Sequence, residues 1–317
     1  MGRVTSDETR DDVPLTNLDQ PLFDQADATK RDLVDYLDAV RDRILPVLRE
    51  RALSVLRVRP GQAPFMQKNL PKYAPDWIRS TTVWAEASRR QVTYALCDDR
   101  RTLLWFANQR AVEYHPALVR GDHFTHLVLD LDPPEGEAFP VVVRAAHLVR
   151  QALEDAGLAG AVKTSGAKGV HVFVPVVAGL DLADLAAATR ALASRAERLD
   201  PKLATTAFIR EDRQGKVFLD STRAGGATVV AAYSPRIRPG APVSFPVAWE
   251  DLDRVTPGDF TLRTAPGLLG DRDPWAACMP EPRPLPADLV EEGHTIPIAR
   301  VQAMHEGKRR ARAKRGE

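Results

Sequence analysis

Cysteine and long apolar runs are scarce in this sequence of 317 residues, and each scarcity excludes a class of protein. Cys97 and Cys278 are the only cysteines, and their wide separation excludes a disulfide framework and argues against a zinc site. No apolar stretch reaches the roughly 18 residues that span a bilayer, and the polar first residues do not resemble a signal peptide. We therefore expect a globular protein of the reducing cytoplasm, without membrane contact.

Positive charge is supplied mostly by arginine, because only nine of the 44 basic residues are lysines. The net charge of +1 conceals a net +4 in 306–317, which leaves about −3 for the rest of the chain. A polyanion would therefore have to bind the folded body at a local basic patch. The basic tail 303–317 is either a solvated end or a nonspecific nucleic-acid arm. We expect residues 1–14 to be disordered.

The apolar pattern predicts alternating helices and strands. Helical spacing marks 29–52, 98–111, 139–156 and 181–199, with Thr29 and Asp98 or Asp99 as caps. Strand patterns mark 53–61, 91–97, 124–131, the two halves of 161–176, 216–220 and 228–234. The links 165–169 and 221–227 are too short for crossover helices, so they indicate antiparallel pairs. The predicted fold class is α/β in the α+β sense, with mixed or antiparallel central sheets flanked by helices, in one domain over 15–300.

The stretch HLVLDLDPP ends an apolar strand in two carboxylates. Side chains alternate along a strand, so Asp130 and Asp132 point to one face, about 6.6 Å apart along the chain. Carboxylates this close share a proton or bind a cation, and near a phosphate that cation would be Mg²⁺ or Mn²⁺. A pair of turn aspartates is the plainer interpretation, since Asp-x-Asp recurs at 251–253 and 271–273. The position at the end of a buried strand favours a site.

A glycine-rich turn, KTSGAKG, follows at 163–169. Gly166 and Gly169 permit a tight turn whose N–H groups converge on a phosphate, while Ser165 adds a hydroxyl and Lys168 a charge. A bare hairpin turn is the alternative. His171, in the strand that follows, is by itself more typical of a satisfied core histidine.

A third carboxylate, Asp220, ends the strand VFLD, and the basic and polar residues Arg223, Thr228 and Arg236 follow it. A single aspartate at a strand end is usually a turn residue. Three carboxylates at strand ends, a Gly/Ser/Lys turn and several arginines together favour chemistry on a phosphate.

These segments resemble the archaeo-eukaryotic primase superfamily, and within it the polymerase domain of bacterial ligase D and its free-standing primase-polymerase relatives. DLDPPEG is similar to the first metal motif, SGAKGVHVF to the nucleotide motif, and VFLD with VAAYSPR to the third motif and its arginine segment. The resemblance runs from about residue 15 to 270. It implies a primase-polymerase fold, with template and 5′-phosphate contacts in 15–120 and the metal and nucleotide motifs in 121–270.

The resemblance also implies a role for each matching residue. Asp130, Asp132 and Asp220 match the catalytic, metal-binding carboxylates of a two-metal nucleotidyl transfer. His115 matches a histidine near the nucleotide sugar, where the family favours ribonucleotides. Asn17, Lys30 and Lys68 match positions that face DNA. The residues implied to bind the nucleotide are Arg57, His115, Ser165, Lys168, His171, Arg223, Thr228 and Arg236.

The implied function is that of a DNA-dependent DNA/RNA polymerase. It would add nucleotides, with ribonucleotides preferred, to primer 3′ ends and fill short gaps during DNA repair. Its cofactors would be two Mn²⁺ or Mg²⁺ ions, and its substrates nucleoside triphosphates. The implied partners are gapped DNA or ends with a 5′-phosphate and 3′-hydroxyl, an ATP-dependent DNA ligase in trans, and Ku. We expect a monomer associated with the bacterial nucleoid.

Two departures from the ligase D pattern affect which branch we expect. Ligase D often has a lysine ten residues before the one that Lys30 matches, and here that position is Gln20. The family has a Q-N or R-N pair after the third motif, and here that pair is Arg223-Ala224. Both weaken the expectation of ligase D-type gap recognition and favour the free-standing branch. An end-joining polymerase acting with Ku and ligase is the alternative within the family.

Other classes fit the motifs less well. A haloacid dehalogenase-type phosphatase opens with Asp-x-Asp, but usually continues with Gly or Thr where this chain has Pro133 and Pro134. A metal-dependent glycosyltransferase would leave the segment 165–168 and Asp220 unexplained. A degenerate module that only binds DNA ends would keep its function in an Asp130→Ala variant, which distinguishes it from an enzyme.

Overall fold

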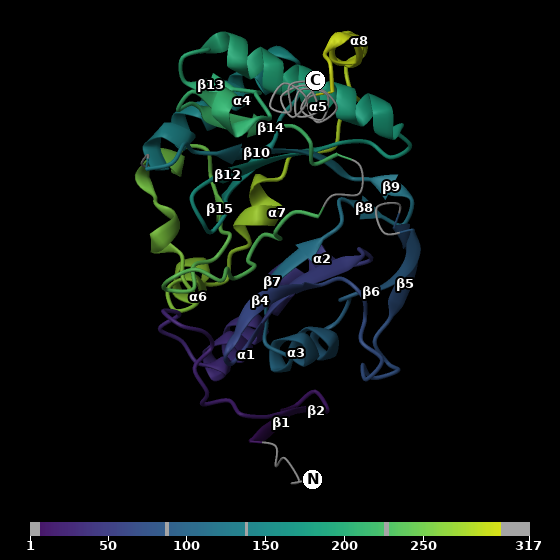
Figure 1. The fold of residues 1–317 in the computed structure, drawn as a ribbon, viewed down its shortest axis with the longest axis vertical. Helices are drawn as coiled ribbons and strands as arrows, with labels where there is room; N and C mark the ends of the chain where they lie inside the picture. The colour runs from purple at the N-terminus through teal and green to yellow at the C-terminus, as the bar shows by residue number, and fades with distance from the viewer. Residues whose placement is uncertain (1–6, 86–88, 137–138, 225–227, 299–317) are drawn as a thin grey trace, which may run out of the picture. The chain divides into compact units, whose positions relative to one another are not determined.

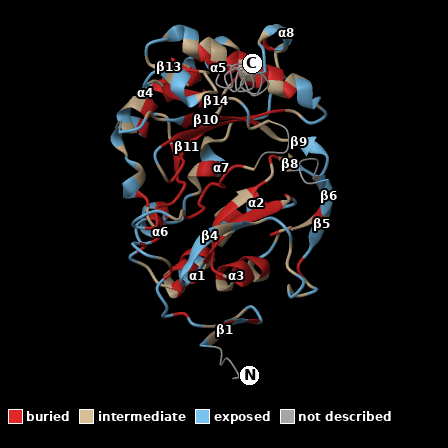
Figure 2. Cartoon of the chain, in the orientation of Figure 1, coloured by how far each residue is buried: buried red, intermediate tan, exposed pale blue. Residues whose placement is uncertain are grey.

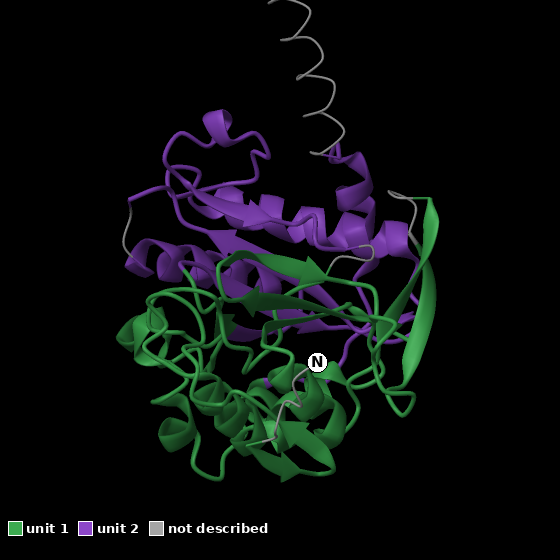
Figure 3. Ribbon diagram, turned by 60° about the horizontal axis from the view of Figure 1, so that its bottom comes forward, with its two compact units in different colours: residues 1–122, 163–167, 226–278 green, residues 123–162, 168–225, 279–317 purple. Residues whose placement is uncertain are grey.

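The computed structural model describes residues 7–85, 89–136, 139–224 and 228–298, so the predicted basic tail lies outside the described residues. The chain forms two compact units, each assembled from segments that are far apart in the sequence (Figure 3). The first unit comprises 1–122, 163–167 and 226–278, and the second comprises 123–162, 168–225 and 279–317. Within the described ranges no helix has the length and apolar character needed to cross a membrane.

The first unit contains most of the short strands. Its elements are β1 (Glu8–Arg10), β2 (Val13–Leu15), α1 (Lys30–Ala39), α2 (Arg41–Leu48), β3 (Leu53–Arg59), β4 (Gln62–Gln67), β5 (Ser80–Ala85), β6 (Arg90–Ala95), α3 (Arg100–Asn108), β7 (Ala111–Pro116), β8 (Val119–Arg120), β15 (Pro246–Val247), α6 (Ala265–Leu269), α7 (Pro274–Cys278) and the 3-10 turns η3 (Leu252–Arg254) and η4 (Pro257–Asp259).

The sheet of the first unit has the order β4-β3-β6-β5, with β7 also paired to β3, and all of these pairs are antiparallel. Helices α1, α2 and α3 pack on one another (Figure 1). The Thr29 side chain accepts the N–H of Asp32, whose carboxylate accepts the N–H of Thr29, so a capping box starts α1. Asp99 caps α3 by accepting the N–H of Thr102. Both predicted caps are confirmed.

The second unit carries the longer helices and the strand that ends in Asp132. Its elements are β9 (His123–Phe124), β10 (His126–Asp132), α4 (Phe139–Asp155), β12 (Val170–Pro175), α5 (Leu182–Leu199), β13 (Ala204–Thr205), η2 (Arg210–Arg213), β14 (Val217–Asp220) and α8 (Ala287–Thr295), while β11 (Ala161–Thr164) runs from this unit into the first.

The sheet of the second unit has the strand order β13-β14-β10-β12. Its central strand β10 pairs antiparallel with β12 and β14, whereas β13 and β14 are parallel, so the sheet is mixed as predicted. Helices α4 and α5 contact each other and the sheet, and α8 packs on α5 (Figure 1). The central strand is almost wholly buried while the helices expose one face (Figure 2), which is the pattern expected of amphipathic helices covering a sheet. The core therefore holds β10 and its terminal carboxylates rigidly.

Three expectations from the sequence are wrong in part. Residues 8–15 form the antiparallel hairpin β1–β2 where we expected disorder, although residues 1–6 lie outside the described part. The segment 29–52 is two helices, because Val40 leaves the helical conformation at φ −98° and ψ 8°. The segment 228–234 is no strand and has a single bridge, between Thr228 and Ala117. The apolar run 229–233 is buried, and its backbone N–H groups donate to carbonyls of Pro116, Tyr114 and Ser244, so it lies along β7 without forming a regular strand.

The predicted division near residue 120 lies close to the break between Asp122 and His123. However, the first unit also takes in 163–167 and 226–278, so the predicted core 121–270 contributes to both units. A single catalytic domain over 15–300 stays a prediction.

Candidate active site

The carboxylates of the second unit meet through strand register. Asp130 on β10 lies opposite Asp220 on β14 and opposite His171 on β12. Residues directly opposite each other in a sheet share a face, so the three side chains form one row across three strands. Asp132, two residues further along β10, belongs to the same face. Asp132 and Asp220 are the last residues of their strands, as the sequence predicted.

Asp130 is buried and engaged by two basic side chains. His171 Nε2 lies 3.1 Å from one carboxylate oxygen, and Arg223 Nη2 donates to the other at 2.7 Å. Burial raises the pKa of Asp130, but His171 and Arg223 outweigh that effect and hold it below its usual range. Asp130 is therefore ionised at neutral pH, and His171 contacts a carboxylate where the resemblance implied a phosphate contact.

Asp220 is held in place by its own loop. The backbone N–H and the hydroxyl of Thr222 donate to Asp220 Oδ1 at 2.8 and 2.6 Å. Arg223 Nε lies 3.3 Å from Asp220 Oδ2, an ion pair without the alignment of a hydrogen bond. One guanidinium thus lies between the carboxylates of Asp130 and Asp220.

Asp132 differs from the other two because solvent reaches its side chain. Partial burial and the negative charges of Asp130 and Asp220 raise the pKa of Asp132. Because solvent reaches the side chain, we attribute the higher pKa mainly to repulsion from the other two carboxylates. Like charges gathered on one face favour either a shared proton or a bound cation.

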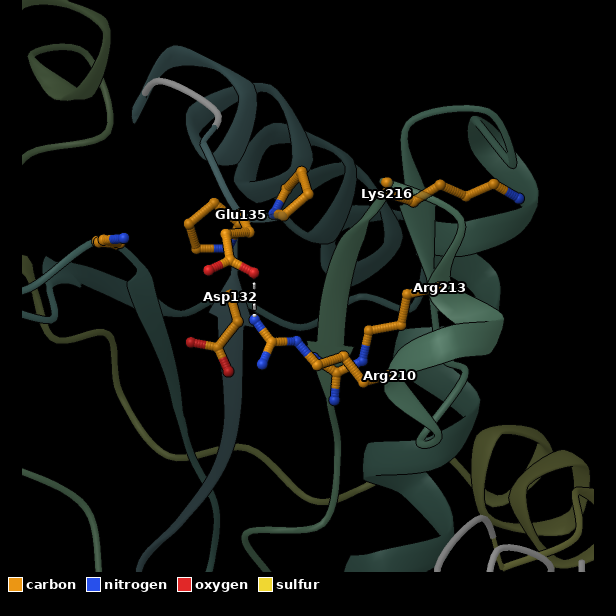
Figure 4. A pocket seen from close by; sticks show the side chains of 9 residues that line it. Asp132, Glu135, Arg210, Arg213 and Lys216 are labelled. Atoms are coloured by element: carbon orange, nitrogen blue, oxygen red, sulfur yellow. Dashed lines mark hydrogen bonds and ion pairs between the residues drawn. The ribbon is translucent and has the colours of Figure 1, made fainter.

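A pocket of about 570 Å³ opens beside Asp132 and is lined largely by charged side chains (Figure 4). Arg210 reaches across to Glu135 at 3.0 Å, and both side chains are exposed. Arg213 lies 3.7 Å above the Phe218 ring and donates to two backbone carbonyls, so it is fixed. The residues lining this pocket are Asp132, Pro133, Pro134, Glu135, Lys168, Arg210, Arg213, Gly215 and Lys216. Of the four cations, the sequence analysis singled out only Lys168.

The two glycines of the turn are explained by close packing. A Cβ on Gly169 would lie 2.3 Å from the Leu131 carbonyl oxygen, so only glycine lets β12 begin against β10 there. Gly166 has φ +67°, and a Cβ on it would meet Arg236 and the backbone of Val243 and Ser244 within 2.8 Å. Close packing alone accounts for both glycines, so their presence is not evidence that the turn binds a phosphate.

In the first unit, Glu113 brings His115 and Arg236 together. Its Oε2 lies 2.9 Å from His115 Nε2 and 3.1 Å from Arg236 Nε. Arg236 Nη1 also donates to the Ser165 carbonyl, and the Ser165 hydroxyl accepts the N–H of Ala167 at 3.2 Å. Sequence reasoning missed Glu113 and the strand β7 that carries it, although a charged residue two positions before His115 in the segment VEYHP was a usable signal.

Two other nucleotide residues implied by the resemblance have partners outside this cluster. Arg57 is buried and its guanidinium makes hydrogen bonds to Gln67, Tyr73 and Gln109. Thr228 lies at the bridge to Ala117.

The residues implied to face DNA differ in exposure. Asn17 and Lys68 are exposed, whereas Lys30 is only 3% exposed. Its Nζ donates to the Thr16 carbonyl at 2.5 Å and to Asn108 Oδ1 at 2.7 Å. Burial, followed by the charge of Arg110, lowers the pKa of Lys30 to about 8. In this conformation Lys30 stabilises the start of α1, and a phosphate contact would require it to exchange these partners.

The carboxylate row has the donor chemistry of a divalent metal site. In the described part of the chain, no group of three or more His, Cys, Asp or Glu side chains is arranged to hold a metal ion as it stands. Asp130 instead faces His171 and Arg223, so a guanidinium supplies positive charge to Asp130 and Asp220. Hard carboxylate oxygens are the ligands that Mg²⁺ and Mn²⁺ prefer, so the donor chemistry of these residues fits such an ion, which would take the place of the Arg223 guanidinium beside Asp130 and Asp220.

Comparison with known proteins agrees with the fold. Residues 29–275 match the family described as LigD, primase-polymerase domain. The bifunctional non-homologous end joining protein LigD of Bacillus subtilis is 32% identical over 259 residues, which are 80% of this chain and 41% of that protein. The multifunctional non-homologous end joining DNA repair protein LigD of Mycobacterium tuberculosis is 33% identical over 255 residues, 76% of this chain and 33% of that protein.

A solved structure is similar over nearly its whole length. The polymerase domain from Mycobacterium tuberculosis Ligase D in complex with DNA superposes with a TM-score of 0.77 at 30% identity, covering 84% of this chain and 99% of that one. The chain belongs to the LigD primase-polymerase domain family. It spans about a third to two fifths of the length of these two curated relatives.

Proposed function

We propose that this protein is a template-dependent DNA/RNA polymerase that adds nucleotides, ribonucleotides in preference, to primer 3′ ends and fills short gaps during DNA repair. The observation that supports this most is the row of Asp220, Asp130 and His171 across three adjacent strands, with Asp132 on the same face. Its presence in a chain of the LigD primase-polymerase family favours nucleotidyl transfer over the phosphatase and glycosyltransferase alternatives.

Each polar group near the row would have a distinct task. Asp130, Asp132 and Asp220 would hold two Mg²⁺ or Mn²⁺ ions, which lower the pKa of the primer 3′-hydroxyl and neutralise the leaving pyrophosphate. Lys168, on the wall of the pocket next to Asp132, would stabilise the negative charge that develops on the phosphates. The residues that we propose for nucleotide binding in the second unit are His171 and Arg223. In the first unit they are Ser165, Arg236, Arg57 and Thr228, with His115 at the sugar.

DNA would bind through its phosphates. Asn17 and Lys68 are exposed and available, and Arg210 and Lys216 add cations beside Asp132. Ends with a 5′-phosphate would engage Lys30 only after it leaves Thr16 and Asn108. We infer that a separate ATP-dependent ligase seals the product and that the protein acts as a monomer in the bacterial cytoplasm.

The second candidate is an end-joining polymerase that acts with Ku and a ligase. It is favoured by the names of the similar proteins from Bacillus subtilis and Mycobacterium tuberculosis, both described as non-homologous end joining proteins. A non-catalytic module that binds DNA ends is the third, and the complete set of carboxylates argues against it.

The test is extension of a labelled primer across a gap of one to three nucleotides, with and without a downstream 5′-phosphate. Mn²⁺ or Mg²⁺ and ribo- or deoxyribonucleotides are compared for the wild type and Asp130→Ala. Asp271→Ala, an exposed aspartate from another Asp-x-Asp, is the matched control. We expect metal-dependent addition that only Asp130→Ala abolishes. DNA binding without addition under any condition would favour the non-catalytic module, and addition that requires Ku would favour end joining.

A further inference from the structure

Glu113 is a buried anion whose carboxylate is shared by three groups of the first unit. Besides His115 Nε2 and Arg236 Nε, it binds the backbone N–H of Ile237, which donates to Oε1 at 2.9 Å. Glu113 is only 3% exposed. Burial raises its pKa, but the hydrogen bond from His115, the charge of Arg236 and the Ile237 N–H outweigh that effect and lower it to about 2.

The contact with His115 determines which ring nitrogen carries the proton. An ionised carboxylate only accepts hydrogen bonds, so His115 must donate from Nε2–H. In the neutral ring Nδ1 then has a free lone pair and can accept a hydrogen bond, but cannot donate one. Glu113 therefore makes His115 an acceptor toward any ligand that reaches Nδ1.

The same carboxylate fixes the direction of Arg236. The guanidinium is a planar fork with five N–H donors; Nη1 donates to the Ser165 carbonyl, and Nε forms an ion pair with Glu113 that lacks the alignment of a hydrogen bond. The bond to the Ile237 N–H anchors the backbone beside Arg236 to β7. A single carboxylate thus orients His115 through a hydrogen bond, holds the backbone beside Arg236 and places a negative charge next to the guanidinium.

We propose that Glu113 is a positioning residue for nucleotide selection, which presents His115 as an acceptor for the ribose 2′-hydroxyl and holds Arg236 for the triphosphate. This inference rests on the proposed polymerase function. A site built to bond a hydroxyl discriminates against an analogue that lacks it. Glu113 would therefore contribute to ribonucleotide preference without touching the sugar or the phosphates itself.

The sharpest variant is Glu113→Gln, which keeps the shape and removes the charge. The amide keeps one acceptor oxygen for the three groups that the carboxylate serves; when that oxygen accepts the Ile237 N–H, the N–H₂ faces His115 and Arg236, and the ring is driven toward the tautomer protonated at Nδ1. We expect the KM for ribonucleotides to rise about tenfold, roughly the effect of one lost hydrogen bond, with kcat little changed. The preference for ribo- over deoxyribonucleotides should fall in parallel. Glu154→Gln, on an exposed turn of α4, is the matched control.

A double-mutant cycle separates positioning from general loss of stability. If Glu113 acts on sugar choice through His115, Glu113→Gln should leave the sugar preference of a His115→Ala variant unchanged. Thermal unfolding of each variant reports the purely structural effect. A lower midpoint with an unchanged sugar preference would overturn the proposal.

The ring tautomer is measured independently of catalysis, by long-range ¹⁵N–¹H correlation NMR with His115→Ala for assignment. We expect a proton on Nε2 in the wild type and a shift toward Nδ1 in Glu113→Gln. A wild-type ring protonated on Nδ1 would overturn the inference even if Glu113→Gln did not fold. If the wild type extends no primer, the proposed function fails, while the NMR result still decides whether Glu113 orients His115.

Discussion

Asp130 on β10 lies directly opposite Asp220 on β14, and the Arg223 guanidinium lies between their carboxylates, 2.7 Å from one and 3.3 Å from the other. Like charges directly opposite each other destabilise an antiparallel pair. This register is therefore tolerable only with a positive charge beside it, and Arg223 supplies one. A function that gathers carboxylates on one face explains why the sequence retains so unfavourable a pair.

The first prediction concerns Arg223→Gln. In EDTA we expect the free energy of unfolding to fall by about 1–3 kcal/mol, below the range for breaking a fully buried ion pair, because the Arg223 side chain is 35% exposed. Added Mn²⁺ should restore more stability to the variant than to the wild type, since a cation bound to the folded state stabilises it. Urea unfolding measures both effects.

The control for this prediction is Arg210→Gln. Arg210 pairs with Glu135 while both are largely exposed, so its loss should cost less than about 1 kcal/mol. Equal losses in the two variants, or no differential response to Mn²⁺, would contradict the role given to Arg223.

The second prediction tests the packing of the glycine turn. In Gly169→Ala the new methyl group would lie 2.3 Å from the Leu131 carbonyl oxygen, a backbone atom that cannot move aside cheaply. We expect a loss of about 1–3 kcal/mol and a large loss of primer extension, because Leu131 lies between Asp130 and Asp132. Gly267→Ala, where a Cβ meets nothing within 4 Å, should retain both stability and activity. Unchanged extension by Gly169→Ala would show that β10 tolerates the shift.

The helix caps and the strand ends could be predicted from the sequence, because neighbouring residues alone determine them. Thr29 and Asp99 cap helices because a short polar side chain before a helical pattern satisfies the first N–H groups whatever the rest of the chain does. Asp132 and Asp220 end their strands for similarly local reasons, an apolar run followed by turn-forming residues. The mixed sheet was also predicted, but the antiparallel pair expected across 221–227 is wrong, because 228–234 is no strand and β14 pairs with β10 and β13.

Long-range pairing was not predictable in this way. Nothing near His171 in the sequence reveals that register sets it against Asp130, and Glu113 binds the N–H of a residue 124 positions away. The segment 228–234 has strand-like composition and bonds its backbone to β7 at Tyr114 and Pro116, yet it forms no regular strand. Lys30 matched a DNA-facing position, yet its charge is satisfied internally by Thr16 and Asn108. The roles assigned to individual site residues stay predictions.

The third prediction uses the lowered pKa of Lys30, about 8 in the folded protein against about 10.4 in an unfolded chain. Between these values the unfolded state binds more protons, so the free energy of unfolding should rise with pH, by up to about 3 kcal/mol. Lys30→Met should lack this rise, whereas Lys202→Met, which removes an exposed lysine, should retain it. Urea midpoints at pH 7.5 and 10 compare the three proteins. An equal rise in the urea midpoint between pH 7.5 and 10 for the wild type and Lys30→Met would show that the lowered pKa of Lys30 is not its cause.

The last prediction concerns the cations beside Asp132. Lys216 lines the charged pocket with Arg210 and Arg213, and we expect it to contact a backbone phosphate of bound DNA. Lys216→Glu should then weaken binding to all sequences alike and reduce the slope of log K against log salt by about one. Lys202→Glu makes the same charge change at an exposed site of the same unit that does not line the pocket, so it should leave the slope unchanged. Fluorescence anisotropy of a labelled gapped duplex, titrated at several salt concentrations, measures the slope. The same slope for Lys216→Glu and the wild type would mean that DNA does not reach this pocket, and the polymerase would then have to hold its primer through cations of the first unit such as Lys68.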